Sequence, residues 1–351
     1  MKSTHRVHGT STEGADRAPS SSSNHYHSTL RCIRKGLVWL LTKKTNDDRY
    51  ILRPDGTIDL AFLYLLILKL NKYGLLLHAF VVMSNHIHLV VTDVHGKLPK
   101  FMCEFLSESG KALKLALDTT CRVWSGDRYS AVEILDRDAA ERAIEYCQTN
   151  PTRAGLTLPK DWPGLSSAHY EIGDTLRAER PEFYGSKKRP DVVECVLSPL
   201  PRMIGESEDE VLDREALSRS KPGSDGEAKI VERQCSRLQR AVEGRVEKRV
   251  AEILEKRAKE GRGPLAGRGA VRQVPREKRG NHPFRRIRPK FMTKDHELME
   301  QAKEGYKAFC VAHYDAKERY VAGETKTWFP HGTYGYRELL GVNVRSGGAA
   351  A

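Results

Sequence analysis

The segment of residues 75–93 constrains the fold more than any other part of the chain, because most of its positions are apolar or β-branched. The polar pair Ser84 and Asn85 interrupts it near the middle. A run of this composition favours buried β-strand, and a short polar pair inside it is typical of a turn. We therefore predict two adjacent strands, or one bent strand, over residues 75–93.

Further elements precede this segment. The run of aromatic, β-branched and basic residues at positions 26–38 can begin with a strand. From residue 57 the apolar positions continue almost without a break to residue 70, and residues 71–74 supply a stop. This apolar run is too long for a typical buried strand, so it predicts a helix.

Three more elements follow. Residues 97–117 carry apolar side chains at helical spacing, although Gly110 interrupts them, and residues 129–135 are expected to form a short strand. Asp136 or Asp138 can then cap a helix. Because a proline disfavours helical backbone at the residue before it, this helix is predicted to run to position 149 and to stop before Pro151.

The predicted order β, α, β, β, α, β, α resembles a ferredoxin-like split βαβ sandwich of the α+β class. In this fold the helices cover one face of an antiparallel sheet, and the other face is free for chemistry. We expect a disordered tail over residues 1–24, this α+β domain over residues 25–170, a linker region over residues 171–227, and a mainly helical, basic C-terminal extension over residues 228–351.

The C-terminal extension contains two distinctive segments. Residues 228–262 are highly charged, with a sparse apolar stripe at helical spacing that should pack either inside this chain or on another one. The stripe consists of Leu238, Val242, Val246, Val250 and Ile253. Residues 261–290 are rich in Gly, Pro and Arg and end in a dense positive patch at 285–290, which suits either a solvated loop or an arm that contacts phosphates.

The charge balance indicates an anionic partner. The chain has 59 Lys and Arg against 46 Asp and Glu, a formal net charge of +13, which favours nucleic acid although a basic surface can also merely aid solubility. Its seven cysteines are scattered without a C-x-x-C pair, so neither a disulfide framework nor a structural zinc site is expected. The longest apolar run, residues 58–70, is too short for a membrane span, so no membrane partner is predicted.

An H-x-H pair inside the 75–93 segment is the sharpest signal for chemistry. His86 and His88 are two positions apart, so on a strand they point to one face, whereas Ile87 and Leu89 point to the opposite, apolar side. Two adjacent imidazoles suit Mn or Zn, and Mg becomes possible when phosphate oxygens complete the ligand shell. The alternative is a pair of ordinary surface histidines.

Tyr146 and Asn150 provide the second signal. They are four positions apart on a predicted helix and therefore share a face. Asn150 can offer its amide oxygen as a third ligand while the hydroxyl of Tyr146 reaches the same volume. A tyrosine on a helix is far more often a packing residue than a nucleophile, so only the conjunction with the histidines points to catalysis.

The two motifs together resemble those of the HUH single-tyrosine transposases. The motifs read HAFVVMSNHIHLVV over residues 78–91 and IEYCQTNPTRAGL over residues 144–156. The REP-associated tyrosine transposases and their chromosomal relatives are the most similar branch. The resemblance covers residues 25–170 well and the rest of the chain loosely.

This resemblance implies a metal-dependent endonuclease and strand transferase. The implied partner is single-stranded or hairpin DNA, in transposition or in the processing of chromosomal repeats. Tyr146 would be the nucleophile that forms a 5′-phosphotyrosine, and the implied ligands of Mg²⁺ or Mn²⁺ are His86, His88 and Asn150. A cytoplasmic, nucleoid-associated protein that acts as a monomer or homodimer is expected.

Two departures from the pattern of these transposases stand out. Ser84 occupies a position where relatives often carry proline. The serine in place of proline would loosen the turn before the second strand. The middle of the tyrosine helix is more polar than usual, and Gln148 could compete for a ligand role.

Other interpretations remain open. His25 and His27 repeat the H-x-H pattern on the first predicted strand, and histidine-triad hydrolases would need a third histidine where Val90 stands. A non-catalytic nucleic-acid-binding protein derived from a transposase would keep the basic surface, although the intact set of candidate residues argues against decay. A domesticated host enzyme would share the chemistry.

Several side chains outside the motifs suit DNA contacts. Arg31, Arg122 and Arg153 are candidates for phosphate binding because the guanidinium fork matches phosphate oxygens. Trp124 and Tyr129 can stack on unpaired bases, although core packing is an equal alternative.

Overall fold

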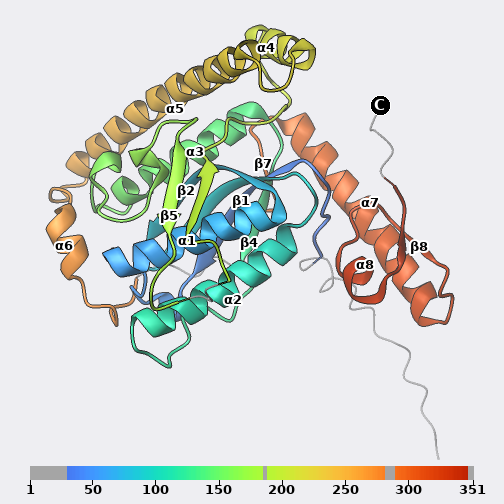
Figure 1. Ribbon diagram of the computed structural model, residues 1–351, viewed down its shortest axis with the longest axis horizontal. Helices are drawn as coiled ribbons and strands as arrows, with labels where there is room; N and C mark the ends of the chain where they lie inside the picture. The colour runs from blue at the N-terminus through green and yellow to red at the C-terminus, as the bar shows by residue number, and fades with distance from the viewer. Residues whose placement is uncertain (1–29, 185–187, 281–288, 347–351) are drawn as a thin grey trace, which may run out of the picture.

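A five-stranded sheet forms the centre of the structure, a computed structural model that describes residues 30–184, 188–280 and 289–346 (Figure 1). The strand order is β2-β3-β1-β4-β7. The pairs β2–β3, β3–β1 and β1–β4 are antiparallel, and only the short edge strand β7 runs parallel to its neighbour β4. The predicted mixed α+β class with an antiparallel sheet is confirmed.

The elements have the following bounds. The sheet consists of β1 (Leu37–Lys44), β2 (Leu75–Met83), β3 (His86–Asp93), β4 (Ser130–Ile134) and β7 (Phe291–Met292). The shorter strand pairs are β5 (Thr175–Glu179) with β6 (Val192–Val196), and β8 (Trp328–Phe329) with β9 (Asn343–Val344). The helices are α1 (Gly56–Tyr73), α2 (Leu98–Ala116), α3 (Arg137–Arg153), α4 (Glu208–Arg219), α5 (Asp225–Lys259), α6 (Gly267–Gln273), α7 (His296–Val321) and α8 (Gly335–Leu340).

Local sequence signals explain where α1 ends and the central hairpin begins. The side chain of Asp55 caps the helix by accepting a hydrogen bond from the backbone N–H of Thr57. Gly74 ends it in the left-handed conformation, with φ of 66°, which glycine adopts without steric cost. The chain then enters β2, and Ser84 and Asn85 form the turn to β3, so the predicted pair of adjacent strands is confirmed.

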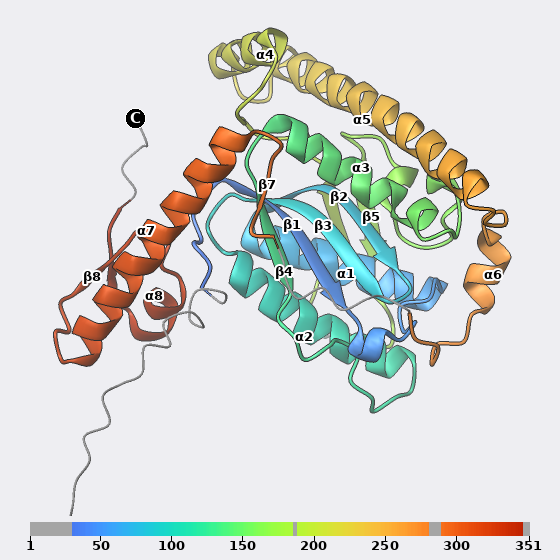
Figure 2. The same ribbon diagram turned by 180° about the vertical axis from the view of Figure 1, so that it is seen from behind.

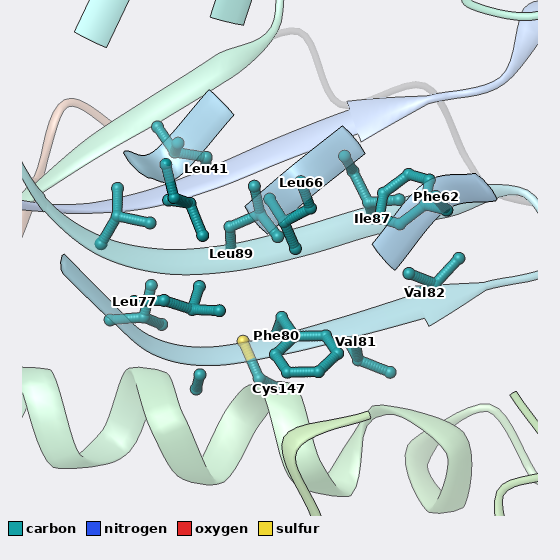
Figure 3. Close-up of a cluster of buried hydrophobic side chains, with 14 of the residues drawn as sticks. Leu41, Phe62, Leu66, Leu77, Phe80, Val81, Val82, Ile87, Leu89 and Cys147 are labelled. Carbon is teal, nitrogen blue, oxygen red and sulfur yellow. The ribbon is translucent and has the colours of Figure 1, made fainter. Parts of the chain in front are cut away.

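Helices lie on both sides of the sheet. Ile87 and Leu89 on β3 belong to the same buried cluster as Phe62 and Leu66 of α1 (Figure 3). Helix α2 packs against α1. His86 and His88 alternate with Ile87 and Leu89 along β3, so their side chains lie on the opposite face of the sheet. On that side α3 packs against β2 and β3, so the face expected to be free is partly covered by α3.

The course of α3 differs from its prediction. Asp136 is the N-cap as expected, with its side chain accepting from the backbone N–H of Ala139, but the helix continues through Pro151 to Arg153. Proline removes one backbone donor, yet its fixed φ is compatible with helix, and here it lies in the last turn. The Thr152 hydroxyl also donates to the carbonyl of Thr157, which ties down the chain after the helix.

Two further segments differ from their predictions. The first strand is β1, which starts only at Leu37, and residues 26–29 lie outside the described part of the chain. The region of residues 171–227, expected to be a linker, contains the β5–β6 hairpin and α4. Leu176 and Val193 of the hairpin are buried against α1 in the main core, so hydrophobic burial holds this region to the domain.

The long helix α5 crosses the outside of α3 (Figures 1 and 2). Leu238 and Val242 of its apolar stripe are fully buried in the main core, and Val246 is half-buried against it. The stripe therefore makes an internal contact. Helix α7 lies apart from α5, on another side of the sheet, where it packs with β8 and the chain around α8 (Figure 2).

Two candidate features fall wholly or largely outside the described residues. These are the H-x-H pair of His25 and His27, and most of the basic patch at 285–290. Within the described ranges, no helix combines the length and apolarity needed to span a bilayer.

Buried His78 predicts a pH dependence of stability. Its Nδ1–H donates to the carbonyl of Ser198 and its Nε2 accepts from the hydroxyl of Thr92, and burial lowers its pKa from 6.5 to about 4. Between these two values the unfolded chain binds a proton that the folded chain does not, so stability falls as pH falls. We expect wild type to lose ~3 kcal/mol more than His78→Asn between pH 6.5 and 4. Parallel urea titrations at each pH measure the difference, and identical pH profiles would contradict it.

The internal role of the α5 stripe gives a second prediction. Leu238 is fully buried, so Leu238→Ala should lower the free energy of unfolding by roughly 2–5 kcal/mol because it removes apolar contacts and leaves a cavity. The exposed Leu254 on the same helix is the matched control, and Leu254→Ala should change stability by less than about 1 kcal/mol. Equal effects of the two substitutions would show that the stripe does not pack on α3.

Candidate active site

The histidine pair lies on β3, which has a strand on each side. His88 faces Val81 of β2 and Thr42 of β1 across the two ladders, and His86 faces Met83 and Lys44. A strand hydrogen-bonded along both edges has little freedom to shift its register. The two imidazoles are therefore fixed to one face of the sheet.

His88 is held as a neutral imidazole with one nitrogen unsatisfied. Its Nδ1 lies 2.8 Å from the hydroxyl oxygen of Thr42 in a hydrogen bond, whereas its buried Nε2 has no hydrogen-bond partner. Only 4% of the residue is exposed. Burial, with a smaller contribution from His86, lowers the pKa of His88 well below its usual value, so both ring nitrogens remain uncharged.

His86 lies beside His88 at the start of the strand. The two ring centroids are 4.8 Å apart, with the ring planes nearly perpendicular. Oδ1 of the turn residue Asn85 lies 2.7 Å from His86 Nδ1 and accepts a hydrogen bond from it. Because an amide oxygen can only accept, Nδ1 carries the proton. The turn thus orients the His86 ring and leaves its Nε2 as the basic nitrogen.

The phenol of Tyr146 reaches this pair from α3. The ring centroids of Tyr146 and His88 are 4.9 Å apart, in an edge-to-face arrangement. Asn150, one turn further along α3, is buried, with 6% of its surface exposed. Residues four apart share a helix face, so Asn150 belongs to the side of α3 that carries Tyr146. Gln148 lies about 200° around the helix from Tyr146, on another face, and does not share this placement.

Arg153 adjoins the Tyr146 ring, and Glu145 lies between this arginine and a second one from α5. The Arg153 guanidinium carbon lies 5.1 Å from the centroid of the Tyr146 ring. Oε1 of Glu145 is 3.9 Å from Arg153 Nη1 and 3.8 Å from Nε of Arg249, which comes from α5. Burial raises the pKa of Glu145 and lowers that of Arg153, with the nearby charges acting in both directions. Helix α5 therefore contributes positive charge beside Glu145, the residue that precedes Tyr146.

The two imidazoles and the amide suit a divalent transition metal better than a cation that prefers oxygen ligands only. Across the described ranges, no cluster of three or more His, Cys, Asp or Glu side chains could hold a metal. The candidate ligands are two imidazoles and one amide, and the unpartnered Nε2 of His88 is a buried lone pair that coordination would satisfy. The residues present thus fit a metal whose remaining ligands come from phosphate oxygens or water.

The other candidate residues lie elsewhere. Arg31 stacks over the ring of Tyr129 at 4.0 Å and bonds to its carbonyl, and this pair lines a separate cavity. Trp124 is buried and donates to the hydroxyl of Ser109, which identifies it as a packing residue. Arg122 is exposed next to Gly126. Of the three candidate arginines, only Arg153 adjoins Tyr146.

The sequence alone did not identify Thr42, Glu145 or Arg249 as parts of the site. Thr42 is distant in sequence from His88 and meets it only through the β1–β3 register. Arg249 is one of many charged residues on α5, and only the crossing of α5 over α3 distinguishes it. No local motif could have revealed either residue.

The contact between Thr42 and His88 predicts a measurable stability effect. Thr42→Val keeps the shape of the side chain but leaves His88 Nδ1 buried without a partner, so we expect a loss of about 1–3 kcal/mol in the free energy of unfolding. Thr175→Val, at an exposed strand position, should change stability by less than about 0.5 kcal/mol. Chemical denaturation compares the two, and a neutral Thr42→Val would show that the hydroxyl does not hold the ring.

No protein-family model and no curated protein matches the chain. Eight chains of solved structures are similar to part of it, among them the following two. A REP-associated tyrosine transposase bound to a REP hairpin is 21% identical, with 40% of this chain and 81% of that chain covered and a TM-score of 0.34. A candidate transposase from Deinococcus radiodurans R1 is 20% identical, with 28% of this chain and 79% of that chain covered and a TM-score of 0.25. These likenesses are partial, so the function proposed below rests on the site itself.

Proposed function

We propose that the protein is a metal-dependent single-stranded DNA endonuclease and strand transferase that uses Tyr146 as its nucleophile. The observation that carries this proposal is the 4.9 Å separation between the rings of Tyr146 and His88. A phenol from a helix and two imidazoles from a sheet meet there, close enough for one phosphate group to contact both. The net charge of +13 is consistent with a nucleic-acid partner.

The proposed reaction is a transesterification. The phenol oxygen of Tyr146 attacks the scissile phosphorus in line, a new P–O bond forms to the tyrosine, and the bond from phosphorus to the 3′ oxygen breaks. The departing 3′ oxygen gains a proton to become a hydroxyl, balancing the proton lost from the phenol. The product is a 5′-phosphotyrosine diester. A 3′ hydroxyl of a second DNA end can attack it in reverse, which joins strands without an external energy source.

We assign the residues around the phosphate as follows. His86, His88 and Asn150 would hold the divalent metal, Mn²⁺ or Mg²⁺, which supplies Lewis-acid polarisation of a non-bridging phosphate oxygen. The neutral state of His88 keeps its Nε2 lone pair available for this role. Arg153, over the face of the Tyr146 ring, places a positive charge where the phenol oxygen and the phosphate both carry negative charge in the transition state.

Covalent trapping tests this proposal. The protein is incubated with a library of hairpin oligonucleotides with random single-stranded flanks and Mn²⁺ or Mg²⁺, then run on a denaturing gel. We expect a protein–DNA adduct that requires metal, is abolished in Tyr146→Phe, and falls at least 100-fold in His88→Ala, because loss of metal-assisted charge stabilisation costs several kcal/mol. The matched control Tyr170→Phe, a half-buried tyrosine outside the site, should retain the adduct.

The same assay separates the alternatives. An adduct that persists in Tyr146→Phe would overturn the assignment of the nucleophile. DNA binding without an adduct under either metal would favour a non-catalytic binding protein that has kept a basic surface.

A further inference from the structure

Lys44 lies on the same face of the sheet as the histidine pair. It is the last residue of β1 and stands directly across the ladder from His86. The Thr42 side chain contacts His88 on that face, and residues two apart on a strand share a face, so the Lys44 side chain projects there too. Side chains directly opposite each other on antiparallel strands have Cβ atoms about 4.5–5.5 Å apart. Lys44 therefore adjoins His86 as Thr42 adjoins His88.

The side chain of Lys44 is accessible from solvent, unlike the imidazoles beside it. It is 43% exposed, and its Nζ forms an ion pair with Oδ1 of Asp48 at 3.0 Å. That carboxylate oxygen is buried, so a strand that approaches from solvent meets the lysine and not the oxygen that pairs with it. An ammonium has three N–H donors, and one carboxylate leaves it able to donate to a phosphate as well.

The turn that carries Asp48 is fixed to the candidate site. Asp48 has a φ of 53°, in the left-handed region that few residues other than Gly, Asn and Asp adopt. Its carbonyl accepts a hydrogen bond from the backbone N–H of Gly280 at 2.9 Å and a longer one from Nδ2 of Asn85 at 3.5 Å. Asn85 is also the residue that orients the His86 ring. The same turn thus fixes both the ammonium of Lys44 and the imidazole of His86.

From this placement we infer that Lys44 binds the DNA phosphate adjacent to the one that Tyr146 attacks. A phosphate held between the imidazoles and the phenol continues into the strand on both sides, and one of these sides leads over His86 to Lys44. The ammonium recognises a phosphate as a point charge and by hydrogen bonds. The inference rests on the proposed function, and it adds to that function a residue that binds the strand beside the metal site.

Lys44 supplies a second positive charge, separate from that of Arg153. The interior around His88 is neutral because burial lowers the pKa of this imidazole, and Arg153 lies over the Tyr146 ring on α3. Lys44 comes instead from β1, so a strand that contacts both cations is held at two points. Because Lys44 contacts a phosphate that does not react, its contribution is to the affinity and register of the strand and not to bond breaking.

Methylphosphonate interference in a Tyr146→Phe background tests the inference without any need for cleavage. The probe is a hairpin oligonucleotide with single-stranded flanks, selected for binding from the random library, and each copy in a series carries one uncharged methylphosphonate. On the unmodified probe, Lys44→Gln should weaken binding by roughly 3- to 10-fold in fluorescence anisotropy and reduce the slope of log K against log salt concentration by roughly 0.7. When the methylphosphonate replaces the phosphate that Lys44 contacts, the two proteins should bind equally. That phosphate should be next to the one joined to Tyr146 in the adduct.

The matched control is Lys72→Gln, because Lys72 is 51% exposed and paired with Glu104 at 2.7 Å but lies on α1, on the other side of the sheet. It should bind as the background protein does, and thermal melting checks that each variant is folded. Unchanged affinity in Lys44→Gln, or an equal loss at every methylphosphonate position, would overturn the inference even if Tyr146 still forms its adduct. Coupling of Lys44 to one phosphate without any adduct would refute only the proposed cleavage, and no binding to any probe would overturn both.

Discussion

The packing of α3 against β2 and β3 is the contact on which the candidate site depends. This packing buries Cys147 and Ile144 in the main core. Because successive residues turn around the helix axis, Tyr146 lies on the adjacent face of α3 and points toward His88. Helix α5 adds a second layer, because Leu238 and Val242 pack from outside and resist any displacement of α3. The geometry of the candidate site therefore follows from hydrophobic burial on both sides of one helix.

The same burial creates the chemical character of the site. Desolvation keeps His88 neutral and leaves its Nε2 without a partner, a state that is unfavourable in isolation and suited to a metal. Positive charge enters from the outer side, where Arg153 and Arg249 share the carboxylate of Glu145. The site thus combines a dry, neutral interior with a basic rim, an arrangement that suits a phosphate with one side toward the imidazoles and the other toward the arginines.

The sequence predicted what local patterns encode. The central hairpin, the helix α1 with its stop at residues 71–74, and the shared face of Tyr146 and Asn150 all follow from composition and spacing. It did not predict contacts between distant segments: the β5–β6 hairpin on α1, the crossing of α5 over α3, and the pairing that brings Thr42 to His88. Short amphipathic strands such as β5 carry weak signals, and the expected end of α3 was wrong because Pro151 fits a last helical turn.

We propose that the phenol of Tyr146 and the imidazoles of His86 and His88 act on one phosphate. Tandem mass spectrometry of the nuclease-trimmed, proteolysed protein after incubation with DNA and Mn²⁺ tests it most directly. We predict a single modified peptide, residues 143–153 after tryptic cleavage, with a nucleotide joined through its 5′ phosphate to Tyr146. A nucleotide on another tyrosine, or one joined through a 3′ phosphate, would contradict it.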